Sequence, residues 1–532
     1  MNSNEVKRRK IQGFADMIAL ATVLVVGGMA GDKGITYVAA ALLAYAVLWA
    51  PYSGKAADTL GKLLRVRNVK GQYKSADALR RNVMLFQLAA GVFVTVVLVI
   101  GAGAIGGKLF QVQYSTFLMM LLAPALLLRG VSAIFMGFCQ GESAELPTAV
   151  ASVLRRVFIL IFSLIFCRGL GSYGQKVSNL LVTDNFAAMY TGVGAVLAIN
   201  VSEIFVIIFL LVMQKVVRRS KRREPSAGMR SAESFMEAVQ NFTVNRAPYF
   251  AVQLLLLLPM VLGLLFFRKS AVDWEAGMTD YGVFCGKYLV LGGFCIVLMS
   301  GIFIQVCSKT VVALRKGEQR FARVIFQSGI HIIVIYSLFF AGILAVMAEQ
   351  VSNLLNSGTV AAKLLRGGAL IIPFAALALY FARFLMLTGK SLLVLGVLLI
   401  SDIVYVLSMT LFLNVWKAGI LALVYAGIMG GAVCCILLGV IICRQLRIGG
   451  VWLHTFLIPA GAACAVGFLC MFLAKILLPH LGDGVTLLVC SVVSWAIYWL
   501  ILLFARNFND QELECIPGGK WITSFGQLFH VL

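Results

Sequence analysis

Residues 82–105 read NVMLFQLAAGVFVTVVLVIGAGAI and carry no charge. A helix needs about 20 apolar residues to cross about 30 Å of hydrocarbon, so this stretch is long enough to span a membrane. Apolar runs of similar length recur throughout the 532 residues. We therefore predict an all-α polytopic membrane protein with about 14 transmembrane helices. The predicted spans are 11–30, 35–53, 82–105, 115–137, 148–168, 187–213, 247–267, 284–306, 324–347, 367–387, 391–414, 418–442, 452–478 and 485–505.

The composition of the whole chain supports this fold class. Hydrophobic residues make up 61% of the chain and charged residues 13%, with a mean hydropathy of +0.96. A soluble globular protein has about 25% charged residues. A chain this poor in charge cannot cover itself with polar side chains, so most of its surface must face lipid. The twelve cysteines lie mostly in apolar runs without a C-x-x-C pair, which predicts small buried hydrophobic residues and neither a metal site nor a structural disulfide. We also expect no cofactor.

The formal net charge of +23 follows the topology expected of a membrane protein. With a cytoplasmic N-terminus, the two most basic segments, Lys55–Arg81 and Lys215–Arg230, both lie inside, as the positive-inside rule requires. The same orientation predicts a cytoplasmic C-terminus. This placement explains the charge without a nucleic acid as partner. Because the basic segment Lys7–Lys10 leads into a full-length span without a cleavage site, we expect the first span to stay as an anchor.

Short sequence echoes between the two halves predict a duplicated architecture. Lys70-Gly71-Gln72 precedes the third span, and Lys316-Gly317-Glu318 precedes the ninth. A second echo sets Pro124, Arg129 and Gly141 beside Pro373, Arg383 and Gly389. Their common order favours two parallel six-helix bundles, a frequent plan among transporters. The predicted organisation is a first lobe at 1–213, a basic cytoplasmic linker at 214–246, a second lobe at 247–445, two additional helices at 446–505 and a cytoplasmic tail at 506–532.

Three arginines inside predicted spans are the candidate substrate site. Arg129 lies about 12 Å, and Arg155 about 11 Å, from the cytoplasmic ends of consecutive antiparallel helices, with Arg156 next to Arg155. Ionisable groups inside a membrane are costly and face a cavity or a partner. A cluster of guanidinium groups favours a hydrated cavity that binds an anion, and their geometry suits phosphate. The alternative is that these arginines cap carbonyls or pair with Glu142, Glu145 or Glu203.

Five further residues inside spans could line the cavity or couple transport to an ion gradient. Asp402 lies near mid-membrane and is a candidate proton or sodium site, or a partner of Arg383. His331 lies about 10 Å from the cytoplasmic end of the ninth span and is a core histidine in the simpler interpretation. Asp16 and Glu203 are the remaining carboxylates that could bind H+ or Na+.

Motifs of enzymatic chemistry are missing from the sequence. The match to a dinucleotide-binding fingerprint at Gly101–Gly106 closes an apolar span instead of joining a strand to a helix, so we interpret it as helix packing and a turn. There is no P-loop, H-E-x-x-H or G-x-S-x-G motif. The four histidines lack an adjacent acid that would suit a membrane acyltransferase or glycosyltransferase. We therefore predict a protein that is not an enzyme.

A segment around the fourth and fifth spans resembles a family of exporters. The residues are Arg129-Gly130, Phe138–Gly141 and Pro147–Ser152, together with Gly31–Gly34 and the tail Leu513–Gly519. They are similar to the R-G-x-F-Q-G and P-T-A-x-S segments of the polysaccharide exporter, stage V sporulation protein B-like and lipid II flippase-like branch of the multidrug/oligosaccharidyl-lipid/polysaccharide (MOP) exporter superfamily. The similarity is specific over about 40 residues and agrees with a fourteen-span, two-lobe chain.

The resemblance implies a flippase of a bacterial plasma membrane. It would move a lipid-linked oligosaccharide or peptidoglycan precursor by alternating access, with Arg129, Arg155 and Arg156 on the diphosphate and membrane lipids around the polyprenyl tail. One departure is that Arg155-Arg156 stand where this branch has a Glu-Gln pair, and Ile159 where it has an arginine. The alternatives are a multidrug or cation antiporter of the same superfamily and a non-transporting membrane partner of polysaccharide synthesis proteins.

Overall fold

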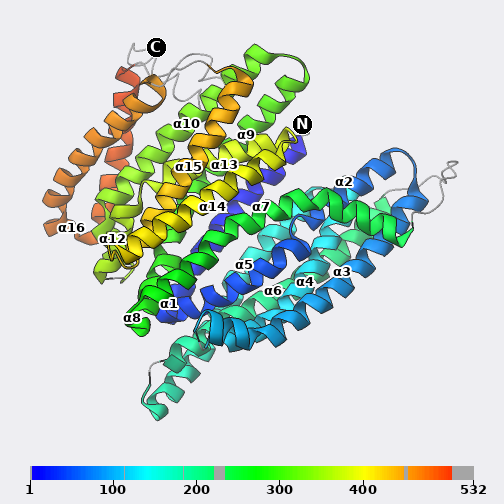
Figure 1. The fold of residues 1–532 in the computed structure, drawn as a ribbon, viewed down its shortest axis with the longest axis horizontal. Coiled ribbons are helices and arrows are strands. Elements are labelled where there is room, and N and C mark those ends of the chain that lie inside the picture. Colours follow the sequence, from blue (N-terminus) through cyan, green and yellow to red (C-terminus); the bar gives the residue numbers. More distant parts are fainter. Residues whose placement is uncertain are drawn as a thin grey trace. The chain divides into compact units, whose positions relative to one another are not determined.

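The computed structural model describes residues 3–112, 114–183, 185–220, 234–356, 358–448 and 453–505, and the regular elements in these residues are all helices (Figure 1). Part of the predicted linker, 221–233, and the predicted tail, 506–532 with its Leu513–Gly519 motif, lie outside the described residues. The elements are α1 (Ser3–Ser53), α2 (Ala56–Val69), α3 (Tyr73–Ala102), η1 (Gly103–Leu109), α4 (Ser115–Gly141), α5 (Leu146–Leu181), α6 (Asn185–Ser220), α7 (Phe235–Ser270), α8 (Trp274–Val283), η2 (Phe284–Tyr288), α9 (Leu289–Arg315), α10 (Gln319–Val346), α11 (Ala348–Leu354), α12 (Gly358–Gly368), α13 (Ile371–Leu387), α14 (Ser391–Asn414), α15 (Leu421–Leu446), η3 (Leu453–Leu457) and α16 (Ile458–Phe504).

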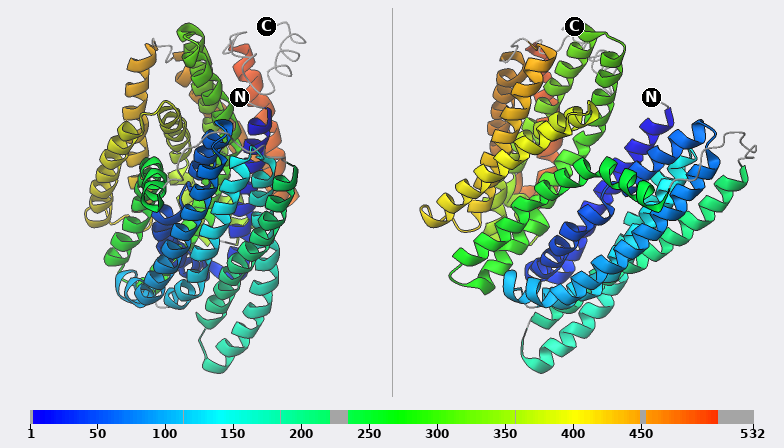
Figure 2. Two further views of the ribbon diagram at one scale, coloured as in Figure 1. Left: turned by 90° about the vertical axis from the view of Figure 1, so that its right-hand side faces the viewer. Right: turned by 45° about the vertical axis from the view of Figure 1, so that its right-hand side comes forward.

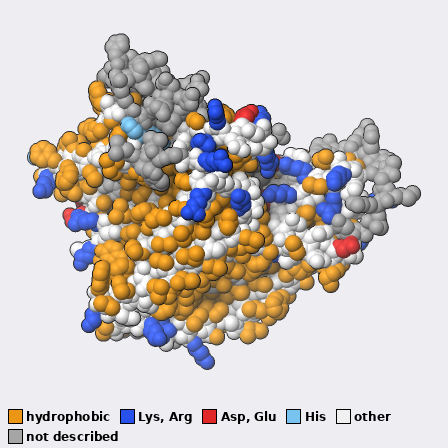
Figure 3. Space-filling model, turned by 45° about the horizontal axis from the view of Figure 1, so that its top comes forward, with side chains coloured by type: hydrophobic (Ala, Val, Ile, Leu, Met, Phe, Trp, Pro, Cys, Tyr) orange, Lys and Arg blue, Asp and Glu red, His pale blue; other side chains and the backbone are white. Residues whose placement is uncertain are grey.

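The helices are long and apolar enough to make a multi-pass membrane protein. In the described residues, 12 helices meet the length and hydropathy of a membrane span, and a bent pair, α12 with α13 at 54°, can supply a further one. The first of the 12 covers Ile11–Val69 and holds two of the predicted spans, 11–30 and 35–53. The prediction of about 14 spans in an all-α protein is therefore confirmed. On the face shown in Figure 3, apolar side chains form a broad surface with Lys and Arg at its margins, as a lipid-facing surface requires.

Two glycines separate spans that would otherwise form one continuous helix. Gly31 has φ 69° and ψ 173° inside α1, and Gly482 has φ 70° and ψ 169° inside α16. This backbone conformation is open to glycine and costly for a residue with a Cβ. The breaks fall between the predicted spans 11–30 and 35–53 and between 452–478 and 485–505, so the chain turns there without a loop.

The chain divides into two compact units. Unit 1 comprises residues 1–286 and unit 2 residues 287–532. Both α7 and α8 belong to unit 1, because both pack on α1. Thr36 Oγ1 of α1 donates a hydrogen bond to the Met278 carbonyl of α8 at 2.5 Å. The predicted lobes, 1–213 and 247–445, follow the sequence echoes instead of these contacts, and they remain a prediction.

In unit 1 the long helices run side by side around α4 (Figure 2). The apolar face of α4 packs on α2, α3 and α6. Leu60 of α2, Leu79 of α3 and Phe138 of α4 are buried in one cluster, which Phe242 of α7 completes. This packing holds the middle of α4, which carries Arg129, between α1, α5 and α6.

In unit 2 the last two predicted spans pack on α10. Aromatic side chains make this contact: Phe339 of α10 lies 4.9 Å from Trp495 and 5.2 Å from Tyr498 between ring centroids. The Tyr498 hydroxyl donates to the Ile335 carbonyl at 3.0 Å. The two additional helices, both within α16, therefore cover α10 of their own chain.

The turns that precede α3 and α10 have the same hydrogen bonds. Gly71 and Gly317 both have the left-handed conformation, with φ 70° and 82°. A glycine there lets the following N–H groups bond back to the last carbonyls of the helix. The equivalent donor and acceptor pairs are Lys70–Val66, Gly71–Asn68 and Gln72–Arg67 in the first turn and Lys316–Val312, Gly317–Leu314 and Glu318–Ala313 in the second. Each residue of the second turn is 246 positions after its counterpart, which supports a duplication.

A second pair of turns, after α4 and after α13, repeats at the same spacing. The left-handed residues are Ser143, with φ 59°, and Gly389, with φ 82°. The equivalent pairs are Glu142–Phe138, Ser143–Gln140 and Ala144–Cys139 in the first turn and Thr388–Phe384, Gly389–Met386 and Lys390–Leu385 in the second. This register places Ala375 opposite Arg129. This register differs from the predicted echo, which sets Arg129 beside Arg383 by their common order, and that echo remains a prediction.

Candidate functional site

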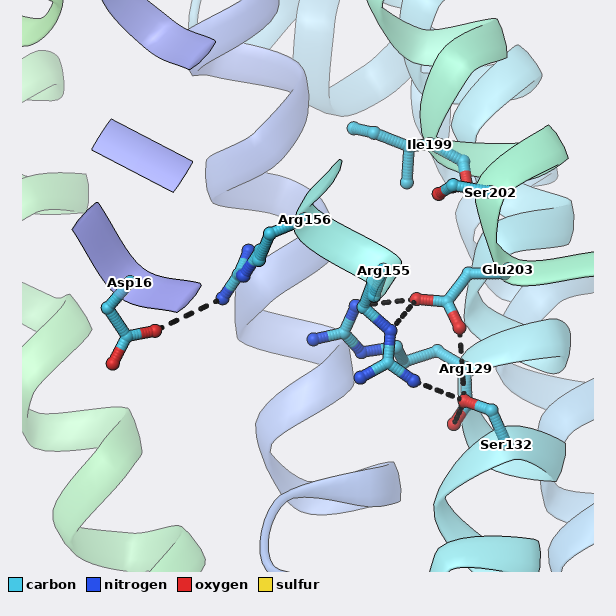
Figure 4. Close-up of polar contacts among 8 residues, drawn as sticks. All are labelled: Asp16, Arg129, Ser132, Arg155, Arg156, Ile199, Ser202 and Glu203. Carbon is cyan, nitrogen blue, oxygen red and sulfur yellow. Dashed lines mark hydrogen bonds and ion pairs between the residues drawn. The ribbon is translucent and has the colours of Figure 1, made fainter. Parts of the chain in front are cut away.

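Four helices of unit 1 bring five predicted site residues together (Figure 4). Asp16 comes from α1, Arg129 from α4, Arg155 and Arg156 from α5, and Glu203 from α6. Arg155 and Arg156 are neighbours in the chain, and their side chains leave α5 in different directions. In Figure 4 Arg155 points to Glu203 and Arg156 to Asp16.

Glu203 is the centre of the cluster and is fully buried. Its Oε1 lies 2.6 Å from Arg129 Nη1 and 2.7 Å from Arg155 Nε. Ser132 Oγ donates to Glu203 Oε2 at 3.0 Å and accepts a hydrogen bond from Arg155 Nη2 at 2.9 Å. The Glu203 carboxylate thus pairs with two guanidinium groups, and the Ser132 hydroxyl bridges Glu203 and Arg155. Such a shared anion offsets the repulsion between two cations in a medium of low dielectric constant.

Arg156 and Asp16 form the outer part of the cluster. Arg156 Nη2 lies 3.7 Å from Asp16 Oδ1, a long ion pair, and the two side chains are 32% and 56% exposed. Arg129 is 21% exposed and Arg155 only 8%. The Arg129 guanidinium also lies over the Trp49 ring, 5.8 Å from its centroid. The three cations therefore differ in access, with Arg155 the most enclosed.

In the structure, each of the three predicted cations has an acidic partner. The alternative interpretation, pairing with Glu203, describes Arg129 and Arg155. Glu142 and Glu145 have other partners, since Glu142 binds Arg80 and Glu145 lies 2.7 Å from Arg65. These two acids sit where α4 ends and α5 begins, beyond the reach of the cluster. Ser132 was missed, although its place three residues after Arg129 puts it on the same helix face.

The candidate residues of unit 2 do not form a comparable cluster. Asp402 of α14 is buried, and its Oδ2 has no hydrogen-bond partner among the described residues. It lies near Tyr405 and Cys434. In the described part of the chain, Asp402 forms no ion pair with Arg383 of α13, which was one of its predicted roles. His331 of α10 is buried, as the simpler interpretation expected.

Comparison with known proteins places this architecture in a structural class. No protein-family model and no curated protein sequence matches the chain. An inward-facing multidrug resistance MATE family transporter of the MOP superfamily superposes with a TM-score of 0.64 and 17% identity, covering 84% of this chain and 99% of its own. The lipid II flippase MurJ, in an inward closed conformation, gives 0.63 and 10%, with 92% and 97% covered. A eukaryotic MATE transporter gives 0.58 and 18%, with 83% and 97% covered.

The chain therefore has the fold seen in a MATE transporter of the MOP superfamily and in the lipid II flippase MurJ. The resemblance predicted from the sequence is confirmed at the level of the fold. The TM-scores of 0.58–0.64 establish the fold, and at sequence identities of 10–18% the fold does not determine the cargo.

Proposed function

We propose that this protein is a flippase that moves an anionic lipid-linked oligosaccharide or peptidoglycan precursor across a plasma membrane by alternating access. The observation that carries the proposal is the pair Arg129 and Arg155 around one buried carboxylate, Glu203, with Arg156 next to them on Asp16. Guanidinium groups bind phosphate through paired, charge-assisted hydrogen bonds. An anionic headgroup is therefore the ligand class that this interior suits best.

The ion pairs suggest how such a headgroup would bind. Arg129 and Arg156 are partly exposed, so a diphosphate would meet them first. Glu203 already occupies the space between Arg129 and Arg155, so a phosphate must share those guanidinium groups with it or displace it. Exchange of one anion for another keeps the cations neutralised in every state, which lowers the cost of binding in a medium of low dielectric constant. A ligand that binds one conformation better than the other shifts the population toward it.

The extent of the structural match supports a flippase. The lipid II flippase covers 92% of this chain, whereas the MATE transporters cover 83–84%. The flippase thus resembles this chain over more of its length than the MATE transporters do, and this favours the flippase as a guide to function. The proposed orientation has both termini in the cytoplasm, as the placement of basic segments predicts.

Coupling to an ion is the second part of the proposal. Asp402 is a buried carboxylate with an oxygen that lacks a hydrogen-bond partner among the described residues, so it could take up H+ or Na+. Asp16 and Glu203 are alternative coupling groups, because each contacts an arginine of the cluster. Synthesis proteins that make the cargo are the expected partners in the cell.

The test compares arginine variants at equal protein level in cells that depend on this protein for export. Arg129→Ala and Arg156→Ala should raise the inner-leaflet pool of lipid-linked saccharide about tenfold, the loss expected for one charge-assisted hydrogen bond. Arg168→Ala is the matched control, because Arg168 is an exposed arginine on α5, the helix that carries Arg156, and lies outside the cluster. Unchanged pools in both variants would remove the proposed site. Arg155→Ala is less informative, since its side chain supports the packing around Glu203.

A multidrug or cation antiporter is the second candidate. Two MATE transporters match with higher identity, 17% and 18%, than the flippase does. The unpartnered oxygen of Asp402 would suit a cationic drug. Efflux of a cationic dye from proteoliposomes distinguishes the two candidates: dye efflux that Asp402→Asn abolishes, with normal saccharide pools, would favour the antiporter. A non-transporting partner of a synthase would show neither activity in proteoliposomes.

A further inference from the structure

An open groove lies at the surface of unit 1, between α3, α4 and α6, away from the arginine cluster. Its volume is about 610 Å³, within the range of small-molecule sites. Asp77, Arg80, Arg81 and Met84 of α3 line the groove together with Gln214 of α6, and Phe135 and Phe138 of α4 supply the apolar lining. The Asp77 carboxylate is paired with Arg80. The groove therefore combines a charged rim with an apolar interior.

The two arginines of the groove have different environments. Arg80 is buried, forms ion pairs with Glu142 and Asp77, and lies over the Phe138 ring. Its charge is thus already balanced. Arg81 is exposed and has no ion pair or hydrogen bond with any residue that the structure describes. Arg81 is the cation that remains available to a ligand.

The charged rim continues into an apolar surface along α3. Lys74, Arg81, Met84 and Leu88 recur at helical spacing and so share one face of α3. Met84 and Leu88 also line a smaller apolar pocket, together with Val131, Ile134 and Phe135 of α4. On the neighbouring surface Val92 and Phe93 are exposed, as lipid-facing side chains are. The face thus runs from cations to hydrocarbon within about four turns.

We propose that this groove binds an anionic phospholipid, with its phosphate on Arg81 and an acyl chain over Met84 and Phe135. A headgroup joined to an acyl chain matches a cation next to an apolar groove. Lys74 adds a second exposed positive charge about two turns away along the same helix. The basic stretch Lys215–Arg230, which begins within the last six residues of α6, would be repelled by Arg81, so it is a poor occupant. This site is independent of the proposed cargo.

Native mass spectrometry of the full-length protein tests the proposal. The protein is released from nanodiscs that contain equal amounts of phosphatidylglycerol and phosphatidylcholine. The wild type should retain one phosphatidylglycerol, and Arg81→Gln should lower its retention about fivefold, which corresponds to about 1 kcal/mol for one basic residue near a membrane surface. Met84→Trp, which fills the groove and keeps the charge, should lower retention of the same lipid.

Arg168→Gln is the matched control, because it removes one exposed arginine outside the groove. Equal retention in the wild type and Arg81→Gln, equal loss in Arg168→Gln, or no preference for phosphatidylglycerol would each overturn the proposal. A photo-crosslinking amino acid at position 84 identifies the occupant. A cross-link to phospholipid supports the proposal, and a cross-link to a peptide of the same chain refutes it.

Discussion

Unit 1 and unit 2 contain the same turn, followed by helices of different charge. The left-handed residue is Ser143 in unit 1 and Gly389 in unit 2, with matching hydrogen bonds around both. Counting 12 and 13 residues onward leads to Arg155 and Arg156 on α5, and to Ser401 and Asp402 on α14. Two cations in one unit thus correspond to a hydroxyl and a carboxylate in the other.

The contacts of these residues differ as their chemistry does. Arg155 reaches Glu203 on α6 through an ion pair. Ser401 donates to the Gly430 carbonyl of α15 at 2.8 Å, where the glycine allows the two helices to approach closely. Asp402 has an oxygen without a hydrogen-bond partner among the described residues. A shared backbone plan therefore carries paired arginines, the candidate anion site, in unit 1 and a buried carboxylate, the candidate cation or proton site, in unit 2.

The largest expected effect comes from removing the shared anion of unit 1. Glu203→Gln leaves two guanidinium groups without a counter-charge and should lower the free energy of unfolding by about 3–5 kcal/mol. Thermal denaturation in detergent measures this loss. The double variant Glu203→Gln with Arg155→Met should recover part of the stability, because one of the stranded charges is gone. An equal loss in the double variant would show that the ion pair is not the cause.

The glycines of the first repeated turn give the next largest effect. Gly71→Ala and Gly317→Ala each place a Cβ in the left-handed conformation, at a cost of about 1–2 kcal/mol. The two losses should agree within about 0.5 kcal/mol if the turns are equivalent. A large difference in denaturation midpoint between the two variants would break the comparison of the units.

Asp402→Asn should raise the free energy of unfolding, whereas Glu203→Gln should lower it. The amide keeps the shape of the side chain and removes a buried carboxylate that has an unpartnered oxygen, so at pH 8 stability should rise by about 1 kcal/mol. The denaturation midpoint measures the change. A loss as large as that of Glu203→Gln would mean that Asp402 has a strong cationic partner.

The smallest effect is expected at the second repeated turn. Ser143→Gly removes the cost of a non-glycine residue at φ 59° and should stabilise unit 1 by about 0.5 kcal/mol, because the entropy cost of glycine offsets part of the gain. Gly389→Ser should destabilise unit 2 by a similar amount. Changes of the same sign in both variants would contradict the equivalence of the turns.

The candidate site could be predicted in its members but not in its pairing. Eight site residues are predicted because charges inside a span require a reason. The five that lie in unit 1 meet in one cluster, whereas the three of unit 2, namely His331, Arg383 and Asp402, form no comparable cluster among the described residues. The sequence does not distinguish Glu142, Glu145 and Glu203 as the acid that neutralises Arg129 and Arg155. Helix rotation and the packing of α6 on α4 decide this. The groove between α3, α4 and α6 is not predicted from the sequence, since it depends on three helices that the chain brings together only by folding.

The sequence by itself determined the all-α membrane fold, because spans must be apolar over about 20 residues and satisfy their own backbone hydrogen bonds. It also marked the turn at Gly71 and its echo at Gly317, where a local backbone conformation requires glycine. Only the tertiary structure decided that one carboxylate pairs with two arginines, and that an oxygen of Asp402 has no hydrogen-bond partner among the described residues. Ion pairing depends on side chains brought within a few ångströms by packing, and no linear spacing encodes that distance.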